Sequence, residues 1–89
     1  MIITVEISLY PLTKDYTEHV IKLIRGLKSN NELEIYTTAM STYIQGDYDV
    51  VMKVLQSELK TLYEALPENA TVLKIIPKNL NIQDGYLEF

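Results

Sequence analysis

The stretch MSTYIQGDYD, residues Met40–Asp49, decides the fold because it predicts a strand that leads directly into a helix. Residues 41–45 have the β-branched and aromatic content of a strand. We expect Gly46 to turn the backbone, and we expect Asp47 or Asp49 to cap the helix that follows at once. Two small hydroxyl side chains precede this junction and a carboxylate at a free helix N-terminus follows it. Such a junction can recognise a small polar molecule, and it is also typical of an ordinary strand-to-helix connection.

The chain before this stretch begins with a strand, Ile2 to Tyr10, in which apolar and mixed residues alternate. One face carries Ile3, Val5, Ile7 and Leu9, and the other carries Ile2, Thr4, Glu6, Ser8 and Tyr10. Pro11 ends the strand because proline lacks a donor for the hydrogen-bond ladder. The sequence therefore predicts one face that packs in a core and a second face of mixed polarity.

Two amphipathic helices are predicted, one on each side of the central stretch. The first is capped by Thr13 or Asp15 and ends at about residue 27 or 28. The second covers about residues 48–66 and ends before Pro67. Their apolar stripes are Tyr16, Val20, Leu23, Ile24 and Leu27 in the first helix, and Val51, Val54, Leu55, Leu59, Leu62 and Leu66 in the second.

Two further strands, at residues 32–38 and 70–76, complete the order βαββαβ. This order predicts an α+β, ferredoxin-like sandwich: a four-stranded antiparallel sheet with two helices on one face. Right-handed crossovers give the strand order 4-1-3-2. We expect one domain over residues 1–77 and a C-terminal extension, residues 78–89, that docks on a partner subunit or adds an edge strand or short helix. The mixed face of the first strand then lies on the side that no helix covers, as a binding groove, an oligomer interface or a solvated face.

The composition excludes several classes of function. The chain has 89 residues and no cysteine, so thiolate metal sites and disulfides are excluded. One histidine excludes a multi-histidine metal site within the chain, and a net charge of −4 disfavours nucleic acid. No apolar run reaches the roughly 18 residues of a membrane span. We expect a cytoplasmic protein. A core this small gives marginal stability, so we also expect the protein to form a homodimer or homotetramer.

Two motifs, taken together, resemble a known family. Ser8-Leu9-Tyr10-Pro11-Leu12 ends the first strand, and Met40-Ser41-Thr42 is followed by Gly46-Asp47 and a Val-Val-Met helix start. With this pair of motifs the chain resembles the thiamine- and hydroxymethylpyrimidine-binding proteins of the YkoF type, within the MTH1187/YkoF-like superfamily. The resemblance extends over about residues 3–77. The resemblance implies a ferredoxin-like fold, no catalytic activity, no cofactor, and binding of thiamine or its pyrimidine moiety. It also implies self-association with open sheet faces packed together, and some relatives of this type carry two such domains in one chain.

The expected ligand site lies on the open sheet face, where the first and third strands are neighbours. The candidate residues are Glu6, Ser8, Tyr10, Ser41, Thr42, Tyr43 and Asp47. An aminopyrimidine presents an amine donor beside ring-nitrogen acceptors, so it pairs with carboxylates and hydroxyls and lies on flat apolar surface. The thiazolium of thiamine carries a positive charge that a tyrosine face can attract.

Three alternatives use the same element order. The first is an ACT-like regulatory or oligomerisation module that binds another small metabolite. The second is an enzyme, which is disfavoured because the only arginine, Arg25, falls late in a helix and His19 stands alone. The third is an RNA-recognition fold, which needs basic and aromatic residues on its central strands, and residues 41–45 contain neither lysine nor arginine.

Overall fold

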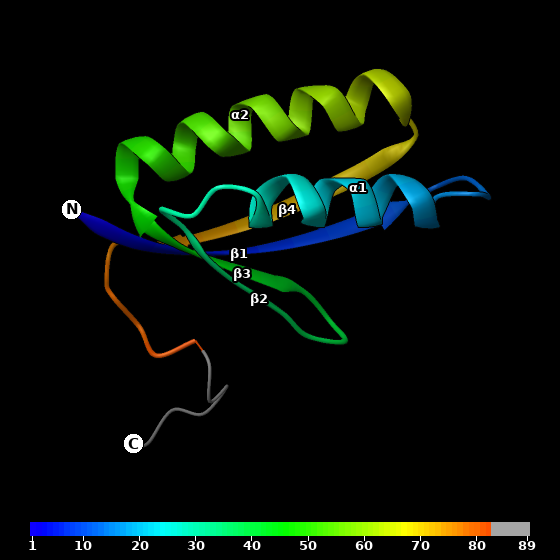
Figure 1. Cartoon of the computed structure of the whole chain (residues 1–89). Helices are drawn as coiled ribbons and strands as arrows, with labels where there is room; N and C mark the ends of the chain where they lie inside the picture. The colour runs from blue at the N-terminus through cyan, green and yellow to red at the C-terminus, as the bar shows by residue number, and fades with distance from the viewer. Residues whose placement is uncertain (83–89) are drawn as a thin grey trace.

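The computed structural model describes residues 1–82, and the last part of the predicted extension, with Tyr86, Leu87 and Phe89, lies outside the described residues. In chain order the elements are β1 (Ile2–Pro11), α1 (Thr17–Lys28), β2 (Glu34–Thr37), β3 (Thr42–Asp47), α2 (Tyr48–Ala65) and β4 (Asn69–Ile76). Both helices lie on the same face of the sheet (Figure 1). The predicted βαββαβ order and the two-layer α+β architecture are confirmed.

The sheet has four strands in the order β2-β3-β1-β4, which is the predicted order 4-1-3-2. All three strand pairs are antiparallel, and β1 at the centre pairs with both β3 and β4. On the helix side the register sets Val5 opposite Ile44 and Ile7 opposite Thr42. On the open side it sets Glu6 opposite Tyr43. The alternation predicted for β1 therefore matches the two faces of the sheet.

The core lies between the sheet and the two helices, and it uses the predicted apolar stripes. Its buried members are Ile3, Val5, Ile7, Leu23, Leu27, Leu33, Ile44, Val51, Leu55, Leu62 and Leu66. Ile24 and Val20 of α1 are half-buried, and Tyr16 at its start is exposed. Each buried side chain of this size contributes about 1.5–3 kcal/mol relative to an exposed one, so the core stabilises the stack of helices on sheet.

Gly46 does not turn the backbone, and this prediction is wrong. Gly46 lies inside β3, paired with Ile3, and the strand continues to Asp47. A Cβ at this position would lie 2.6 Å from Leu33 Cδ2 and 3.3 Å from the carbonyl oxygen of Glu32. A glycine is needed because the segment that leads into β2 passes directly over the strand, not because the chain bends.

The start of α1 also differs from the prediction. The helix begins at Thr17, its N-cap residue is Tyr16, and no side chain caps it. Asp15 has a φ of 60°, the left-handed conformation that aspartate tolerates better than most residues. Asp15 therefore lies in the bend before the helix and cannot cap it, and neither does Thr13. Glu18 in the first turn has the sign of charge that a helix N-terminus favours.

Part of the open sheet face is covered by the segment that follows β4, residues 77–82. The Thr4 hydroxyl donates to the Lys78 carbonyl oxygen at 2.7 Å, and the Gln45 amide donates to Thr4 Oγ1 at 2.8 Å and to the Leu80 carbonyl oxygen. Thr4, Gln45 and Ile82 are buried as a result. The first part of the predicted extension thus packs on its own chain, and a contact with a partner subunit stays a prediction.

Candidate functional site

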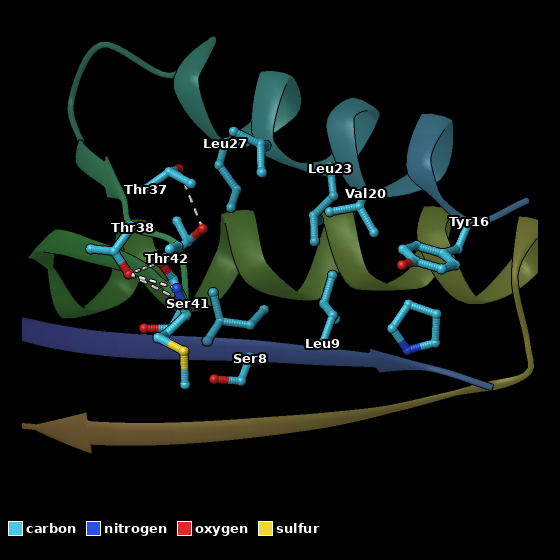
Figure 2. A pocket seen from close by; sticks show the side chains of 15 residues that line it. Ser8, Leu9, Tyr16, Val20, Leu23, Leu27, Thr37, Thr38, Ser41 and Thr42 are labelled. Atoms are coloured by element: carbon cyan, nitrogen blue, oxygen red, sulfur yellow. Dashed lines mark hydrogen bonds between the residues drawn. The ribbon is translucent and has the colours of Figure 1, made fainter.

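A cavity of about 300 Å³ opens between α1, the second half of β1 and the hairpin that joins β2 to β3. Its apolar wall comes from α1 and β1, and its polar wall comes from the hairpin (Figure 2). The residues that line it are Ile7, Ser8, Leu9, Pro11, Tyr16, Val20, Leu23, Ile24, Leu27, Thr37, Thr38, Ala39, Met40, Ser41 and Thr42. Its volume lies at the lower end of the range for small-molecule pockets, so it suits a single heteroaromatic ring with small substituents.

The hairpin wall is shaped by the hydroxyl of Thr38. Thr38 Oγ1 accepts hydrogen bonds from the amides of Met40 and Ser41, at 3.2 and 3.1 Å, and donates to the Ser41 carbonyl oxygen at 2.9 Å. The Thr38 amide also donates to the Ser41 carbonyl oxygen at 2.8 Å. Threonine hydroxyls stabilise turns in this way. The turn leaves the side chain of Met40 at its tip 87% exposed, beside the mouth of the cavity.

The pair of hydroxyls at the base of the hairpin has hydrogen-bonding capacity to spare. Thr37 Oγ1 and Thr42 Oγ1 lie 3.3 Å apart, with Thr42 only 7% exposed (Figure 2). Each hydroxyl can donate once and accept twice, so this one hydrogen bond leaves a donor and several acceptor positions available. The side chains lining the cavity in the described part of the chain include no aspartate, glutamate, lysine, arginine or histidine. The arrangement can bind a neutral ligand that has both a donor and an acceptor.

A second polar cluster lies on the open face of the sheet. Glu6 accepts a hydrogen bond from Ser41 Oγ at 3.0 Å, and its other oxygen lies 3.5 Å from Lys74 Nζ. Beside it the rings of Tyr36 and Tyr43 stack, with centroids 6.3 Å apart and planes 14° from parallel. The Glu6 side chain is 30% exposed, so this cluster is a half-open surface rather than a pocket.

The structure brings five of the seven predicted site residues to one face. Glu6, Ser8, Tyr10, Ser41 and Tyr43 all lie on the open side of the sheet by the register of β1 with its neighbours. Thr42 has the opposite orientation, because Ile7 on the core side is its partner across the strands. Figure 2 shows Ser8 with its hydroxyl on the side of β1 away from α1, so it borders the cavity without pointing into it.

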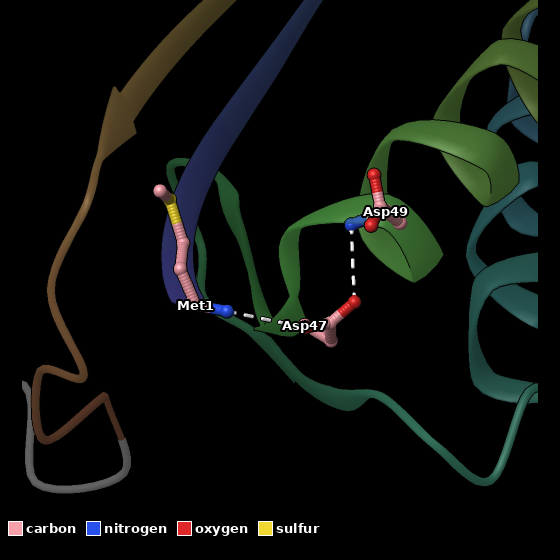
Figure 3. A network of polar contacts seen from close by, with 3 residues as sticks. All are labelled: Met1, Asp47 and Asp49. Atoms are coloured by element: carbon pink, nitrogen blue, oxygen red, sulfur yellow. Dashed lines mark hydrogen bonds and ion pairs between the residues drawn. The ribbon is translucent and has the colours of Figure 1, made fainter.

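Asp47 is not brought to this group. It pairs with Ile2 at the far end of β1, and it lies five positions along β3 from Thr42, roughly 17 Å away. One carboxylate oxygen accepts from the Asp49 amide at 3.2 Å as the N-cap of α2, and the other lies 3.3 Å from the amino group of Met1 (Figure 3). The predicted helix cap at Asp47 is confirmed, and both carboxylate oxygens of Asp47 have partners within the chain.

The sequence reasoning missed several residues that line the cavity. The sequence predicts Thr37 and Thr38 only as part of a strand, and it predicts Val20, Leu23 and Leu27 only as part of a helix stripe. A signal was present in the composition of residues 37–42, TTAMST, which holds four hydroxyl side chains in six positions. Among residues 1–82, no cluster of His, Cys, Asp and Glu could hold a metal ion. No helix in that same range is long and apolar enough to cross a membrane.

The fold is similar to that of several solved structures. A Streptococcus pneumoniae protein is 17% identical, with a TM-score of 0.81, and the match covers 96% of each chain. A Thermotoga maritima protein assigned by name to thiamine biosynthesis or salvage is 18% identical, with a TM-score of 0.80, over 96% of this chain and 95% of that one. A Methanocaldococcus jannascii protein is 26% identical, with a TM-score of 0.74, over 94% and 91%.

The curated proteins contain no match to this chain. A family model described as "Thiamine-binding protein" matches residues 5–80, which include both motifs, most of β1 and all of β2, β3 and β4. The matched range also includes the cavity between α1 and the hairpin. The chain therefore belongs to the thiamine-binding protein family.

Proposed function

We propose that this protein binds thiamine or its hydroxymethylpyrimidine moiety, without catalysis, in the cavity beside the β2–β3 hairpin. The observation that carries the proposal is that both sequence motifs reach the same cavity. Leu9 and Pro11 of the first motif and Met40 and Thr42 of the second line the cavity, and Ser8 and Ser41 border it with their hydroxyls on the open face. The two motifs are about thirty residues apart in the chain, and membership of the thiamine-binding family supplies the class of ligand.

The chemistry of the cavity suits the pyrimidine half of thiamine better than its charged parts. The exocyclic amine of the pyrimidine donates and the ring nitrogens accept, and the hydroxyl pair of Thr37 and Thr42 offers both functions. The side chains of Val20, Leu23 and Leu9 supply apolar surface for the flat ring. A pyrophosphate needs cations or several free amides, and no lysine or arginine among the described residues lines the cavity.

Titration calorimetry tests the ligand directly. Thiamine and free hydroxymethylpyrimidine should bind within about 1–2 kcal/mol of each other, the span of a modest cation–π contribution from the thiazolium. Thiamine pyrophosphate should bind more weakly than thiamine, and the recovered ligand should be chemically unchanged. Absence of binding heat with both thiamine and hydroxymethylpyrimidine would contradict the proposed function.

The Thr42→Val variant tests the position of the site. Valine keeps the shape of threonine and removes the hydroxyl, so thiamine should bind about tenfold more weakly, about 1.4 kcal/mol. Thr61→Val is the matched control, because Thr61 is exposed on α2 and its hydroxyl donates to the Ser57 carbonyl oxygen. If Glu6→Gln or Tyr43→Phe weakens thiamine binding more than Thr42→Val does, the ligand binds at the open-face cluster instead.

We also propose that the protein self-associates as a homodimer or homotetramer. An 89-residue chain has a small core. Many large apolar side chains are exposed on its surface, among them Val72, Leu73, Ile75 and Ile76 of a single strand. Association would remove these side chains from water, and it does not require the ligand.

A further inference from the structure

The strand β1 extends past the end of its neighbour β3. It pairs with β4 as far as Pro11, which lies opposite Asn69, but its pairing with β3 ends at Ile7, opposite Thr42. The last residues of β1 therefore have a neighbouring strand on one side only. On the other side the cavity opens, between β1 and the hairpin residues 38–41 (Figure 2).

Leu9 is the residue of this overhang whose backbone faces the side without a strand. The Tyr48 amide donates to the Met1 carbonyl oxygen at 2.9 Å, so Met1 and every second residue after it direct their N–H and C=O groups toward β3. The Leu12 amide donates to the Glu68 carbonyl oxygen at 2.8 Å, so the even-numbered residues of β1 face β4 instead. Leu9 belongs to the first set, and both of its backbone groups are directed to where β3 has ended.

The hairpin leaves Leu9 without a ladder partner. If the pairing of β1 and β3 continued in the same register, Leu9 would lie opposite Met40 and the two residues would exchange both backbone hydrogen bonds. The Met40 amide donates to Thr38 Oγ1 instead, at 3.2 Å. Within residues 1–82, the N–H and C=O of Leu9 make no hydrogen bond. Pro11, the next residue on this side of β1, has no N–H, so Leu9 provides the last donor of the edge.

The two backbone groups of Leu9 form a donor and acceptor pair of fixed direction. The ladder with β4 holds this part of β1 from the other side, so the N–H and C=O cannot rotate. Threonine hydroxyls do rotate, and the pair of Thr37 and Thr42 can therefore serve a donor or an acceptor equally. The Leu9 side chain lies on the side of Leu23 of α1, in the apolar wall of the cavity (Figure 2). The fixed pair can thus distinguish rings that the hydroxyls cannot.

We propose that the Leu9 backbone recognises the amine-bearing edge of the aminopyrimidine ring. The ring nitrogen beside the amine accepts from the Leu9 N–H, and the exocyclic amine donates to the Leu9 carbonyl oxygen. This edge of the ring reproduces the acceptor and donor that a neighbouring strand would present at the same place. The second ring nitrogen is left for the hydroxyls of Thr37 and Thr42. The pairing rests on the proposed function, and it narrows the ligand class to flat rings that carry an amine next to a ring nitrogen.

Amide hydrogen exchange, followed residue by residue by NMR, tests the pairing without a substitution. In the free protein the Leu9 amide should be unprotected, whereas the amides of Ser8 and Tyr10, which face β4, should be protected. Saturation with hydroxymethylpyrimidine should slow exchange at Leu9 by about tenfold or more. A Leu9 amide that is already protected in the free protein, or that exchanges equally fast in the saturated protein, would overturn the pairing.

Oxythiamine tests whether the order of donor and acceptor matters. It has a carbonyl oxygen in place of the amine and an N–H in place of the neighbouring ring nitrogen. In the orientation of thiamine, it would set a donor against the Leu9 N–H and an acceptor against the Leu9 C=O. Calorimetry should therefore show oxythiamine binding at least about tenfold more weakly than thiamine. Equal affinities would overturn the pairing and leave the proposed function in place.

Two substitutions separate the backbone of Leu9 from its side chain. Leu9→Ala shortens the apolar side chain and keeps the N–H, whereas Leu9→Pro also removes the N–H. A strand tolerates proline where the N–H has no partner in the ladder. Thiamine should bind about tenfold more weakly to Leu9→Pro than to Leu9→Ala. Equal affinities of the two variants, both folded by circular dichroism, would overturn the pairing.

Hydrogen exchange and oxythiamine binding use the unmodified chain, so they decide the question even if Leu9→Pro does not fold. The proposed function has its own readout, the binding heat of thiamine and hydroxymethylpyrimidine. Absence of that heat would overturn the proposed function and the pairing with it. Binding heat together with an unchanged Leu9 amide would overturn the pairing alone.

Discussion

The two ends of β3 carry polar residues that are only a few positions apart in sequence, yet they differ in what they contact. At the first end, Thr42 borders a cavity with Thr37 and keeps hydrogen-bonding capacity unused. At the last end, Gly46 packs beneath Leu33, and Asp47 is engaged by the Asp49 amide and the Met1 amino group. The polar residues of this motif therefore do not form one site, because five steps of extended backbone separate Thr42 from Asp47 by roughly 17 Å.

The difference has a consequence for mutagenesis. Substitutions at the last end of β3 should change the free energy of unfolding and leave ligand affinity alone. Substitutions at the first end should change ligand affinity and leave the free energy of unfolding nearly unchanged, provided that the substituted side chain lies on the face that borders the cavity. The free energy of unfolding and the ligand affinity should be measured for each variant. A variant at the last end that weakens binding, or a cavity-facing variant at the first end that changes only stability, would contradict this difference.

The largest effect on stability is expected for Gly46→Ala. The added methyl group would lie 2.6 Å from Leu33 Cδ2, and Leu33 is buried in the core and cannot move aside freely. Overpacking of this kind costs about 1–3 kcal/mol, which urea denaturation measures. Gly26→Ala is the matched control: its nearest neighbour is the carboxylate of Glu58, at the end of a flexible side chain. Alanine is also the better helix former, so this control should be neutral or more stable.

Asp47→Ala should have an intermediate effect. It removes the N-cap of α2 and so should cost about 1 kcal/mol of unfolding free energy. The ion pair with the Met1 amino group adds little, because both groups are about half exposed or more. Asp47→Asn keeps a capping oxygen and should stay within a few tenths of a kcal/mol of the wild type. Thiamine affinity should be unchanged in both variants, and a weaker affinity would return Asp47 to the ligand site.

Ser41→Ala should have the smallest effect on stability, and it sharpens the comparison at the first end of β3. It removes the hydrogen bond to Glu6, which is partly exposed, so the loss should be about 0.5 kcal/mol. The Ser41 hydroxyl lies on the open face and Thr42 on the other, so thiamine affinity should fall in Thr42→Val and stay within about twofold in Ser41→Ala. A larger loss in Ser41→Ala would favour the open-face site that the sequence suggests.

Much of the fold follows from local patterns. The alternation of Ile2–Tyr10 and the three-and-four spacing of the helix stripes predict the elements, and right-handed crossovers then leave one sheet order. The cap at Asp47 was also predictable, because a cap depends on residues two or three positions away. In each case the interaction that decides the outcome lies within one helical turn or between neighbouring strands.

The tertiary structure decided what those local patterns left open. Gly46 looked like a turn residue, but contact with Leu33, thirteen positions earlier, makes it a strand residue. Thr4 and Gln45 lie on the face that no helix covers, yet residues 78–80 cover them from more than thirty positions away in sequence. The cavity needs α1, β1 and the hairpin together, so no single stretch of sequence encodes it. Periodicity specifies which side chains share a face, whereas burial and cavities depend on which distant segment packs against that face.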